Sequence, residues 1–269
     1  MKQISPSVYN KKYYEVGYST ADIKTLLKKN SFYDRYKEIS SLLPLAKGDI
    51  IVDYGCGNGD LSYYINKNYG CKVVGIDYSS DAIDVCNKRL NSLGSVDKKK
   101  EIKFICSNND SLPNLSGVRA VFFSDVIEHM YNHEIDIVLK TILKWNNKIA
   151  VVVRTDNDIY EKRIRPLLYV VQVIFRIKKL ESVIKESAHN KKIEEEQHVN
   201  LTNSRKLRKL MKKYGLRQKV VAYPKIKTEK IIGQLGQRHV PHLFLGMIGV
   251  LIRLFIFLSP SFYAVYEKE

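Results

Sequence analysis

The chain has 269 residues, with 45 Lys/Arg against 28 Asp/Glu, a formal net charge of +17 and 45% hydrophobic residues. That length accommodates one large α/β domain with insertions and a sizeable core. The four cysteines show no paired metal-ligand spacing, which argues against a structural zinc site or a disulfide framework.

The cysteines fall in or beside expected strands and helices, as small apolar residues of a reducing compartment do. They are Cys56, Cys71, Cys86 and Cys106. Residues 1–30 are polar and rich in tyrosine and lysine, so no signal peptide is expected there. A cytoplasmic location follows.

The positive charge is concentrated in the second half. Residues 154–238 hold 22 Lys/Arg and 9 Asp/Glu, a net of +13, which leaves +4 for the rest of the chain. Such a basic region indicates an anionic partner: nucleic acid, an acidic membrane surface or a phosphorylated substrate. A lysine-rich composition with no partner is the other interpretation.

A helix is expected over residues 31–43, ended by Pro44 and Gly48, and the apolar residues 50–52 then form a first strand. The strand leads directly into three alternating glycines, Gly55, Gly57 and Gly59. Glycines permit positive φ and close approach of a ligand, and the next helix directs its N–H groups at the same place. A tight turn without a ligand would look similar.

The position of the third glycine in a dinucleotide fingerprint is Asp60, which argues against NAD. The next strand, residues 72–77, ends on Asp77, 24 residues after Asp53. An acid at the tip of the second strand of a βαβ unit can accept both ribose hydroxyls. Together these features resemble the class I S-adenosylmethionine-dependent methyltransferases, closely over residues 47–154.

Further along the chain, a helix is capped by the residues from Ser79, and its apolar positions follow helical spacing. Strands are expected at residues 102–106, 120–124 and 149–153, with a helix around 134–143. This alternation predicts a doubly wound, mainly parallel sheet. The resemblance implies seven strands and a helical lid insertion.

After residue 153 the pattern changes. Residues 164–184 interleave apolar side chains with Arg and Lys, residues 186–197 are a polar loop, 203–214 a basic helix, and 216–222 a strand. Residues 243–258 are apolar but too short for a membrane span and carry Arg253, so an interfacial or core helix is expected. Residues 262–266 would form the last strand, antiparallel at the sheet edge.

The domain organisation follows from these elements. Residues 1–46 form an N-terminal helical cap and residues 47–269 the methyltransferase domain. The domain contains a lid insertion at about 158–200 and the apolar helix 243–258.

The resemblance also implies how S-adenosyl-L-methionine is held. Gly55, Cys56 and Gly57 would contact its methionine part, and Asp53 its amine. Asp77 would take the ribose hydroxyls.

Tyr78 would lie beside the ribose. Asn108, Asn109 or Asp110 would read the adenine, and the sequence leaves open which of the three does so. Alternatively, these amides form a turn before Pro113.

Residues 123–130 contain an acid-x-x-Glu-His segment after a central strand, where ligands bind in open sheets. It resembles the segment of many small-molecule methyltransferases, including ubiquinone-biosynthesis O-methyltransferases. Asp125 would lie against the amine or the substrate. His129 is the candidate general base, because imidazole accepts a proton near neutral pH; a histidine that packs a turn is the alternative.

A helical turn starting at Asp125 would place Asp125, Glu128 and His129 on one face. With His198 they resemble the metal site of RNA 3′-terminal ribose 2′-O-methyltransferases, which would suit Mg²⁺ or Mn²⁺. We retain this set as an alternative and assign no metal in the principal interpretation.

The sequence thus predicts methyl transfer to a small or lipid-linked hydroxyl acceptor. The lid resembles one that touches membrane in quinone O-methyltransferases, so peripheral membrane association stays open. The alternatives are an RNA ribose 2′-O-methyltransferase and a non-catalytic basic adaptor. The sequence leaves the oligomeric state open.

Overall fold

A computed structural model describes residues 4, 5, 8, 22–94, 101–164, 198–224 and 259–268. The expected lid segment beyond residue 164, the polar loop 186–197 and the apolar helix 243–258 lie outside the described residues. The proposed domain boundaries therefore stay predictions.

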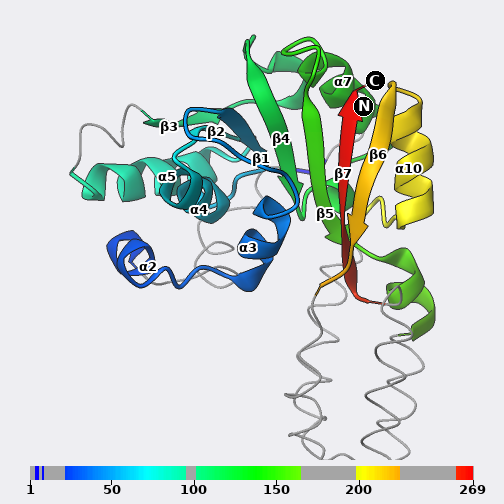
Figure 1. Ribbon diagram of the computed structural model, residues 1–269, viewed down its shortest axis with the longest axis horizontal. Helices are drawn as coiled ribbons and strands as arrows, with labels where there is room; N and C mark the ends of the chain where they lie inside the picture. The colour runs from blue at the N-terminus through cyan, green and yellow to red at the C-terminus, as the bar shows by residue number, and fades with distance from the viewer. Residues whose placement is uncertain are drawn as a thin grey trace, which may run out of the picture.

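The described chain forms a seven-stranded sheet in the order β3-β2-β1-β4-β5-β7-β6 (Figure 1). Neighbours among the first five strands pair in parallel, and β7 pairs antiparallel with both β5 and β6. The predicted doubly wound, mainly parallel sheet is confirmed. Its strands are β1 (Ile50–Tyr54), β2 (Lys72–Asp77), β3 (Ile102–Cys106), β4 (Val118–Ser124), β5 (Ala150–Asp156), β6 (Leu216–Ala222) and β7 (Ser261–Lys268).

The place predicted for the last strand is wrong. β7 is antiparallel, as expected, but it lies between β5 and β6, so β6 is the edge strand. The first six residues of β7 are all buried, which fits a strand covered on both faces and paired on both sides. β6 instead exposes Arg217 and Lys219, charges that suit a sheet edge.

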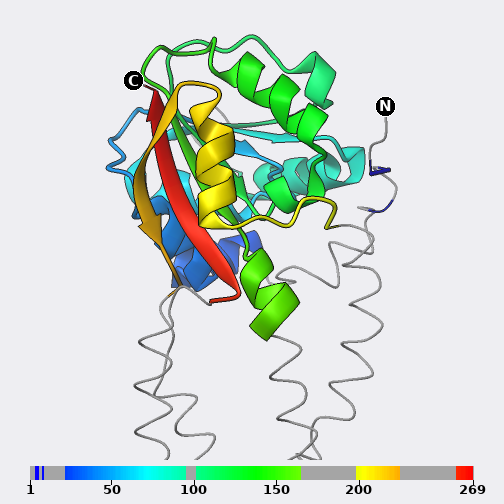
Figure 2. The same cartoon turned by 90° about the vertical axis from the view of Figure 1, so that its right-hand side faces the viewer.

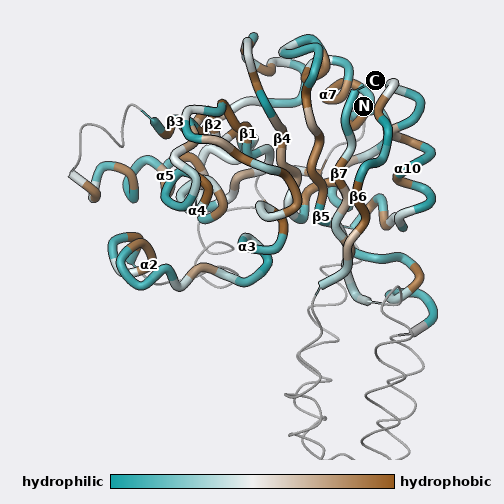
Figure 3. The backbone as a smooth tube through the Cα atoms, in the orientation of Figure 1, coloured by the Kyte–Doolittle hydropathy of each residue, from teal (hydrophilic) through white to brown (hydrophobic). Residues whose placement is uncertain are grey.

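Helices cover both faces of the sheet (Figure 2). One apolar cluster joins α2, α3, α4 and α5 to one face, and a second joins α7 and α10 to the other. Figure 3 shows the hydrophobic residues running along the central strands between these layers. The helices are α2 (Ile23–Lys29), α3 (Asp34–Ser40), α4 (Asp60–Tyr69), α5 (Ser80–Ser92), α7 (Asn132–Ile142) and α10 (Ser204–Lys212).

The helix expected over residues 31–43 is shorter than predicted. α3 spans only Asp34–Ser40, because Tyr33 at its N-cap has an extended ψ of 140°. The next expected helix begins as predicted: the Ser79 side chain accepts a hydrogen bond from the Ala82 N–H at the start of α5.

Gly75 on β2 pairs with Phe104 on β3. A Cβ atom at this position would be 2.5 Å from Phe104 Cδ1 and 3.1 Å from Cys56 Sγ. The φ of Gly75 lies outside the left-handed region, so this residue is required for space alone. By contrast, Gly215 has a φ of +70° and no heavy atom within 4 Å of the corresponding position.

We therefore expect Gly75→Ala to lower the free energy of unfolding by about 1–3 kcal/mol through overpacking. Gly215→Ala should cost roughly 1 kcal/mol through backbone strain alone. Urea denaturation measures both. Equal stability of Gly75→Ala and the wild type would contradict the packing described for β2 and β3.

Candidate functional site

The glycine turn after β1 depends on backbone conformation and on space. Gly55, Gly57 and Gly59 have φ values of +71°, +52° and +81°. A Cβ on Gly55 would meet Val126 at 2.5 Å, and one on Gly59 would meet Phe104 at 2.8 Å. Only glycine satisfies both demands here, which explains the alternating pattern.

Asp77 at the end of β2 ties this turn to the next one. Its Oδ2 accepts the Gly57 N–H and its Oδ1 accepts the Ser79 N–H, both at 2.9 Å. Burial raises the pKa of Asp77, although these backbone hydrogen bonds oppose the shift. Tyr78, half-buried, follows directly. Asp77 thus lies at the end of β2, as predicted, and it also joins the turns after β1 and β2; its contact with a ribose stays a prediction.

Three further N–H groups of the turn are also satisfied within the protein. Gly55 and Cys56 donate to the Ile76 carbonyl at 2.7 and 3.1 Å, and Gly59 donates to the Cys56 carbonyl at 2.8 Å. A ligand would therefore pack against the turn rather than receive these hydrogen bonds. The Cys56 side chain is buried and burial raises its pKa well above the ordinary value, so Cys56 would contribute through its backbone.

Asp53 lies beneath the turn. It is 2% exposed and accepts a hydrogen bond from Ser62 Oγ at 2.7 Å. Burial raises its pKa to about 7, with the Ser62 hydrogen bond opposing the shift. In the described structure this carboxyl joins β1 to the first turn of α4, and contact with a cofactor amine stays a prediction.

The residue in the third-glycine position has a partner that the sequence did not reveal. Asp60 forms a buried ion pair with Arg89 at 2.8 Å, and the Arg89 guanidinium also donates to the Asn58 carbonyl at 2.6 Å. These contacts fasten the turn to α5. Arg89 was missed because its spacing from Asp60 carries no local signal.

The three residues proposed to contact adenine, Asn108, Asn109 and Asp110, have different surroundings in the structure. Asn109 accepts a hydrogen bond from the Tyr54 hydroxyl and donates to Glu134 Oε1 at 2.7 Å. Both polar atoms of Asn109 are thereby engaged. Asn108 and Asp110 have exposed side chains beside this chain of hydrogen bonds, so of the two amides Asn108 is the one available to a ligand.

The segment around these amides also forms the turn that the sequence gave as an alternative. The Ser111 N–H donates to the Asn108 carbonyl at 3.1 Å, within the short helix η2 (Asn109–Ser111).

The turn after β4 differs from the prediction. Asp125 has a φ of +60°, in the left-handed region, and the helical turn η3 begins only at Ile127 (Ile127–His129). The predicted single helical face for Asp125, Glu128 and His129 is therefore wrong. Left-handed backbone at Asp125 directs its side chain differently from the two residues of η3.

Asp125 is paired with two arginines. Arg154 on β5 forms an ion pair with Asp125 Oδ1, and Arg35 on α3 approaches Oδ2 at 3.6 Å. The Asp125 N–H also donates to the Arg154 carbonyl at 3.0 Å. The carboxylate thus links α3, β4 and β5 at the carboxyl edge of the sheet.

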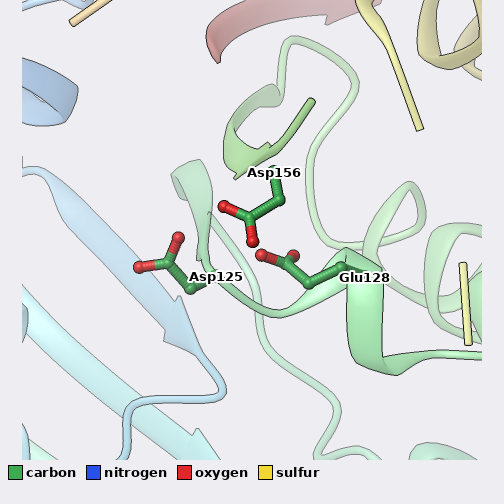
Figure 4. A group of neighbouring side chains, drawn as sticks. All are labelled: Asp125, Glu128 and Asp156. Atoms are coloured by element: carbon green, nitrogen blue, oxygen red, sulfur yellow. The ribbon is translucent and has the colours of Figure 1, made fainter. Parts of the chain in front are cut away.

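Two further acids, Glu128 and Asp156, lie beside Asp125 (Figure 4). Ligand oxygens of Asp125, Glu128 and Asp156 all lie within 4.8 Å of one another, and the Glu128 and Asp156 carboxyl groups point toward each other. Glu128 is 1% exposed and accepts a hydrogen bond from Thr155 Oγ1 at 3.0 Å. Burial, reinforced by the charge of Asp156, raises the pKa of Glu128 to about 8.

Two histidines flank these acids. The rings of His129 and His198 lie edge to face with centroids 4.8 Å apart, and His198 Nδ1 is 3.8 Å from Asp156 Oδ2. The segment carrying His198 is held by hydrogen bonds from the Asn200 N–H to the Glu128 carbonyl and from the Asp158 N–H to the Thr202 carbonyl. His129 and His198 are therefore together, as the metal alternative required, but with Asp156 between His198 and the other acids.

The donor set does not fit a divalent metal centre. Carboxylates and imidazoles are suitable ligand types for Mg²⁺ or Mn²⁺. Asp125, however, is already neutralised by Arg154 and Arg35, and a dication there would face both guanidinium groups. We derive no step through a metal at this site.

The strand order, with the antiparallel β7 inserted beside β5, defines the class I methyltransferase fold. Two solved structures share it: mycolic acid cyclopropane synthase in complex with S-adenosylhomocysteine (TM-score 0.56, 13% identity, 87% of this chain and 82% of that one), and the methyltransferase domain of a bacterial Hen1 (TM-score 0.55, 19% identity, 87% and 97%). At these identities the likeness shows a shared fold.

Residues 51–148 match a family profile described as a methyltransferase domain. Geranyl diphosphate 2-C-methyltransferase from Streptomyces lasalocidi is 36% identical over 56 residues, which cover 21% of this chain and 19% of that protein. Residues 51–148 therefore match a methyltransferase domain within a class I methyltransferase fold, and S-adenosylmethionine, the cofactor implied by the sequence resemblance, is supported.

The raised pKa of Glu128 predicts a pH-dependent stability. Its carboxyl is protonated in the folded protein up to about pH 8, but only below its ordinary pKa of 4.5 when unfolded. Because the folded state binds more protons between these values, the free energy of unfolding should fall as pH rises from about 4.5 to 8.

Glu128→Gln should flatten this dependence, leaving the parts contributed by Asp53, Asp60 and Asp77, whose pKa values burial also raises. Urea denaturation at intervals from pH 5 to 8.5 measures it, with the exposed Asp84→Asn as control. A slope unchanged by Glu128→Gln would contradict the burial and charge environment described for Glu128.

Proposed function

We propose that this protein transfers the methyl group of S-adenosylmethionine to a hydroxyl group of a small or lipid-linked acceptor. The proposal rests on one arrangement: the glycine turn joined to Asp77 lies at the same sheet edge as the cluster of acids and histidines after β4 and β5. A cofactor-binding edge and groups able to accept a proton are thus side by side.

The described residues suggest how the cofactor is held. Asp77 has carboxylate lone pairs beyond those used by Gly57 and Ser79 for the ribose hydroxyls. Asn108 is available to the adenine. The methionine part would lie against the glycine turn above Asp53.

Bound S-adenosylmethionine supplies an electrophilic methyl group, and the protein has to align the acceptor and remove its proton. Most of the rate advantage of such a reaction comes from positioning. His129 is the proposed base, because the Asp125 carboxylate is already charge-paired with two arginines. The His129 ring packs against His198, whose Nδ1 faces Asp156, so Asp156 would act on His129 only through His198 and is a positioning residue in this scheme.

Two observations favour an acceptor with an apolar part. The relatives that match this chain are named for geranyl diphosphate, fatty acid and sphingolipid methylation. Each match covers less than a fifth of the relative's length, so the acceptor comes to this chain only as a proposal. In addition, the sequence is rich in apolar side chains over residues 164–184 and 243–258.

Within the described ranges, no helix combines the length and apolar character needed to cross a bilayer. Peripheral membrane association stays a proposal. It is supported by the apolar and basic sequence of residues 164–184 and by the apolar sequence of residues 243–258.

The second candidate is an RNA ribose 2′-O-methyltransferase. The observation that favours it is α10, whose exposed face carries cations and whose buried side is Leu207 and Met211. The arginine pairing of Asp125 weighs against the metal that this alternative would use. A basic, non-catalytic adaptor on the same fold is the third possibility, and it would require loss of cofactor binding.

Titration of S-adenosylhomocysteine into the protein by calorimetry tests the cofactor site. Binding to the wild type is expected, and Asp77→Asn should weaken it by about 10- to 100-fold through loss of a charged hydrogen-bond acceptor. The control is Asp81→Asn, in the first turn of α5 close to Asp77. Thermal unfolding without ligand separates loss of binding from loss of the fold.

No binding to a folded wild type would overturn the enzyme proposal and leave the adaptor interpretation. Equal affinity in Asp77→Asn would show that Asp77 holds the turns together without contacting the ligand.

The acceptor atom can be assigned with methyl-labelled S-adenosylmethionine. Incubation with a total lipid extract should give a labelled product whose methyl group is on oxygen, released as iodomethane by hydriodic acid. Label retained on carbon after this treatment would contradict the hydroxyl acceptor and favour the chemistry named for the geranyl diphosphate relatives.

A further inference from the structure

A cavity of about 420 Å³ lies between α3, α4 and the β7–β6 side of the sheet. Its volume is in the range of small-molecule sites, which are mostly apolar with a few polar groups. Much of its wall is aromatic or aliphatic: Leu42, Tyr64, Tyr69, Ala222, Tyr223 and Tyr263. The methyltransferase site described above leaves this cavity without a role.

The cavity is linked to the candidate site by one row of paired residues across the sheet. Ser124 pairs with Arg154, Arg154 with Tyr263, and Tyr263 with Ala222. Paired residues on adjacent strands project to the same face, and the apolar neighbours of this row belong to the face covered by α3. This row of paired residues therefore connects Ser124, which precedes Asp125, to Ala222 in the cavity wall.

Side-chain contacts reinforce this connection. The Arg154 guanidinium, which pairs with Asp125, lies 6.0 Å from the centroid of the Tyr263 ring. The Tyr263 hydroxyl donates to Glu38 Oε2 at 2.5 Å, and Glu38 also lines the cavity. Tyr263 thus forms a shared wall between the cavity and the Arg154–Asp125 pair.

The chemistry of the walls favours an uncharged apolar occupant. Glu38 is engaged by Tyr263, and Lys37 on the same rim adds a positive charge of opposite sign. Lys37 is itself paired with Asp34 at 3.6 Å, so both charges are engaged within the protein and neither a cation nor an anion is selected. The tyrosine rings and Leu42 instead offer contact area to a hydrocarbon or aryl group.

We propose that this cavity binds the non-reacting apolar part of the methyl acceptor, with the acceptor hydroxyl directed past Tyr263 toward the acids and histidines. The inference rests on the proposed function and assigns the acceptor an alkyl, prenyl or aryl portion. Specificity for that portion lies with the residues of α3, α4 and β6 that line the cavity.

A series of 4-alkylphenols from phenol to 4-hexylphenol probes this assignment by calorimetry on the full chain with S-adenosylhomocysteine present. Each added methylene should tighten binding by about threefold while the chain enters the cavity. Ser41→Phe, which fills the cavity from α3, should abolish this dependence on chain length.

Ser92→Phe is the matched control. Ser41 and Ser92 are both exposed, and each donates its hydroxyl to a backbone carbonyl three residues earlier, at 2.8 and 2.7 Å, but Ser92 lies on α5, outside the cavity lining. Ala222→Leu fills the same cavity from β6 and serves if Ser41→Phe does not fold.

Retention of the chain-length dependence in Ser41→Phe and Ala222→Leu would overturn the inference, as would affinity in the wild type that does not rise with chain length. So would a preference for tetramethylammonium over the alkylphenols. In those cases S-adenosylhomocysteine binding leaves the proposed function standing. If S-adenosylhomocysteine does not bind the wild type, the proposed function fails and this inference fails with it.

Discussion

The candidate site depends on the hydrogen bonds that Asp77 accepts from Gly57 and Ser79. These two N–H groups belong to the turns after adjacent parallel strands, and one carboxylate fixes the distance between them. Each turn alone would be a mobile connection, because a glycine-rich segment has little conformational preference. The ion pair of Asp60 with Arg89 fastens the same glycine turn to α5 from the other side. A cofactor would thus meet a surface whose shape is set before it binds, which lowers the entropic cost of binding.

The two acids that follow β4, Asp125 and Glu128, differ in the charges that surround them. Asp125 stays paired with Arg154 and Arg35, whereas Glu128 is buried next to Asp156, accepts a hydrogen bond from the Thr155 hydroxyl and forms no ion pair with any residue that the structure describes. The two carboxyl groups therefore have contrasting electrostatic surroundings a few ångströms apart, and burial beside Asp156 raises the pKa of Glu128. The His198 imidazole lies next to Asp156 and against His129, so the proposed methyl transfer to a hydroxyl would have proton acceptors nearby.

Local patterns explain what the sequence predicted correctly. The glycine turn, Asp77 and the start of α5 are each specified by a few consecutive residues, and the alternation of strands and helices predicted the sheet. The insertion of β7 between β5 and β6 was missed because a run of buried apolar residues does not indicate whether the strand pairs with one other strand or with two. Arg89, Glu134 and the pairing of Asp125 depend on contacts between residues far apart in sequence. The cavity beside Tyr263 is likewise made by three separate elements, and no single segment carries a signal for it.

The left-handed backbone at Asp125 illustrates the same limit at a single residue. Helical spacing predicted one face for Asp125, Glu128 and His129, but the hydrogen bond from the Asp125 N–H to the Arg154 carbonyl holds the residue outside the helical turn. The acid that completes the cluster is instead Asp156, at the end of the adjacent strand. Pairing between β4 and β5, rather than the local sequence, decides which acids meet.

Equilibrium dialysis of tritiated S-adenosylmethionine against the purified chain tests the central claim most directly. The arrangement of the glycine turn and Asp77 predicts saturable binding of one molecule per chain, displaced by S-adenosylhomocysteine and unaffected by NAD. Absence of saturable binding, or displacement by NAD, would contradict the account of this sheet edge as a methyl-donor site.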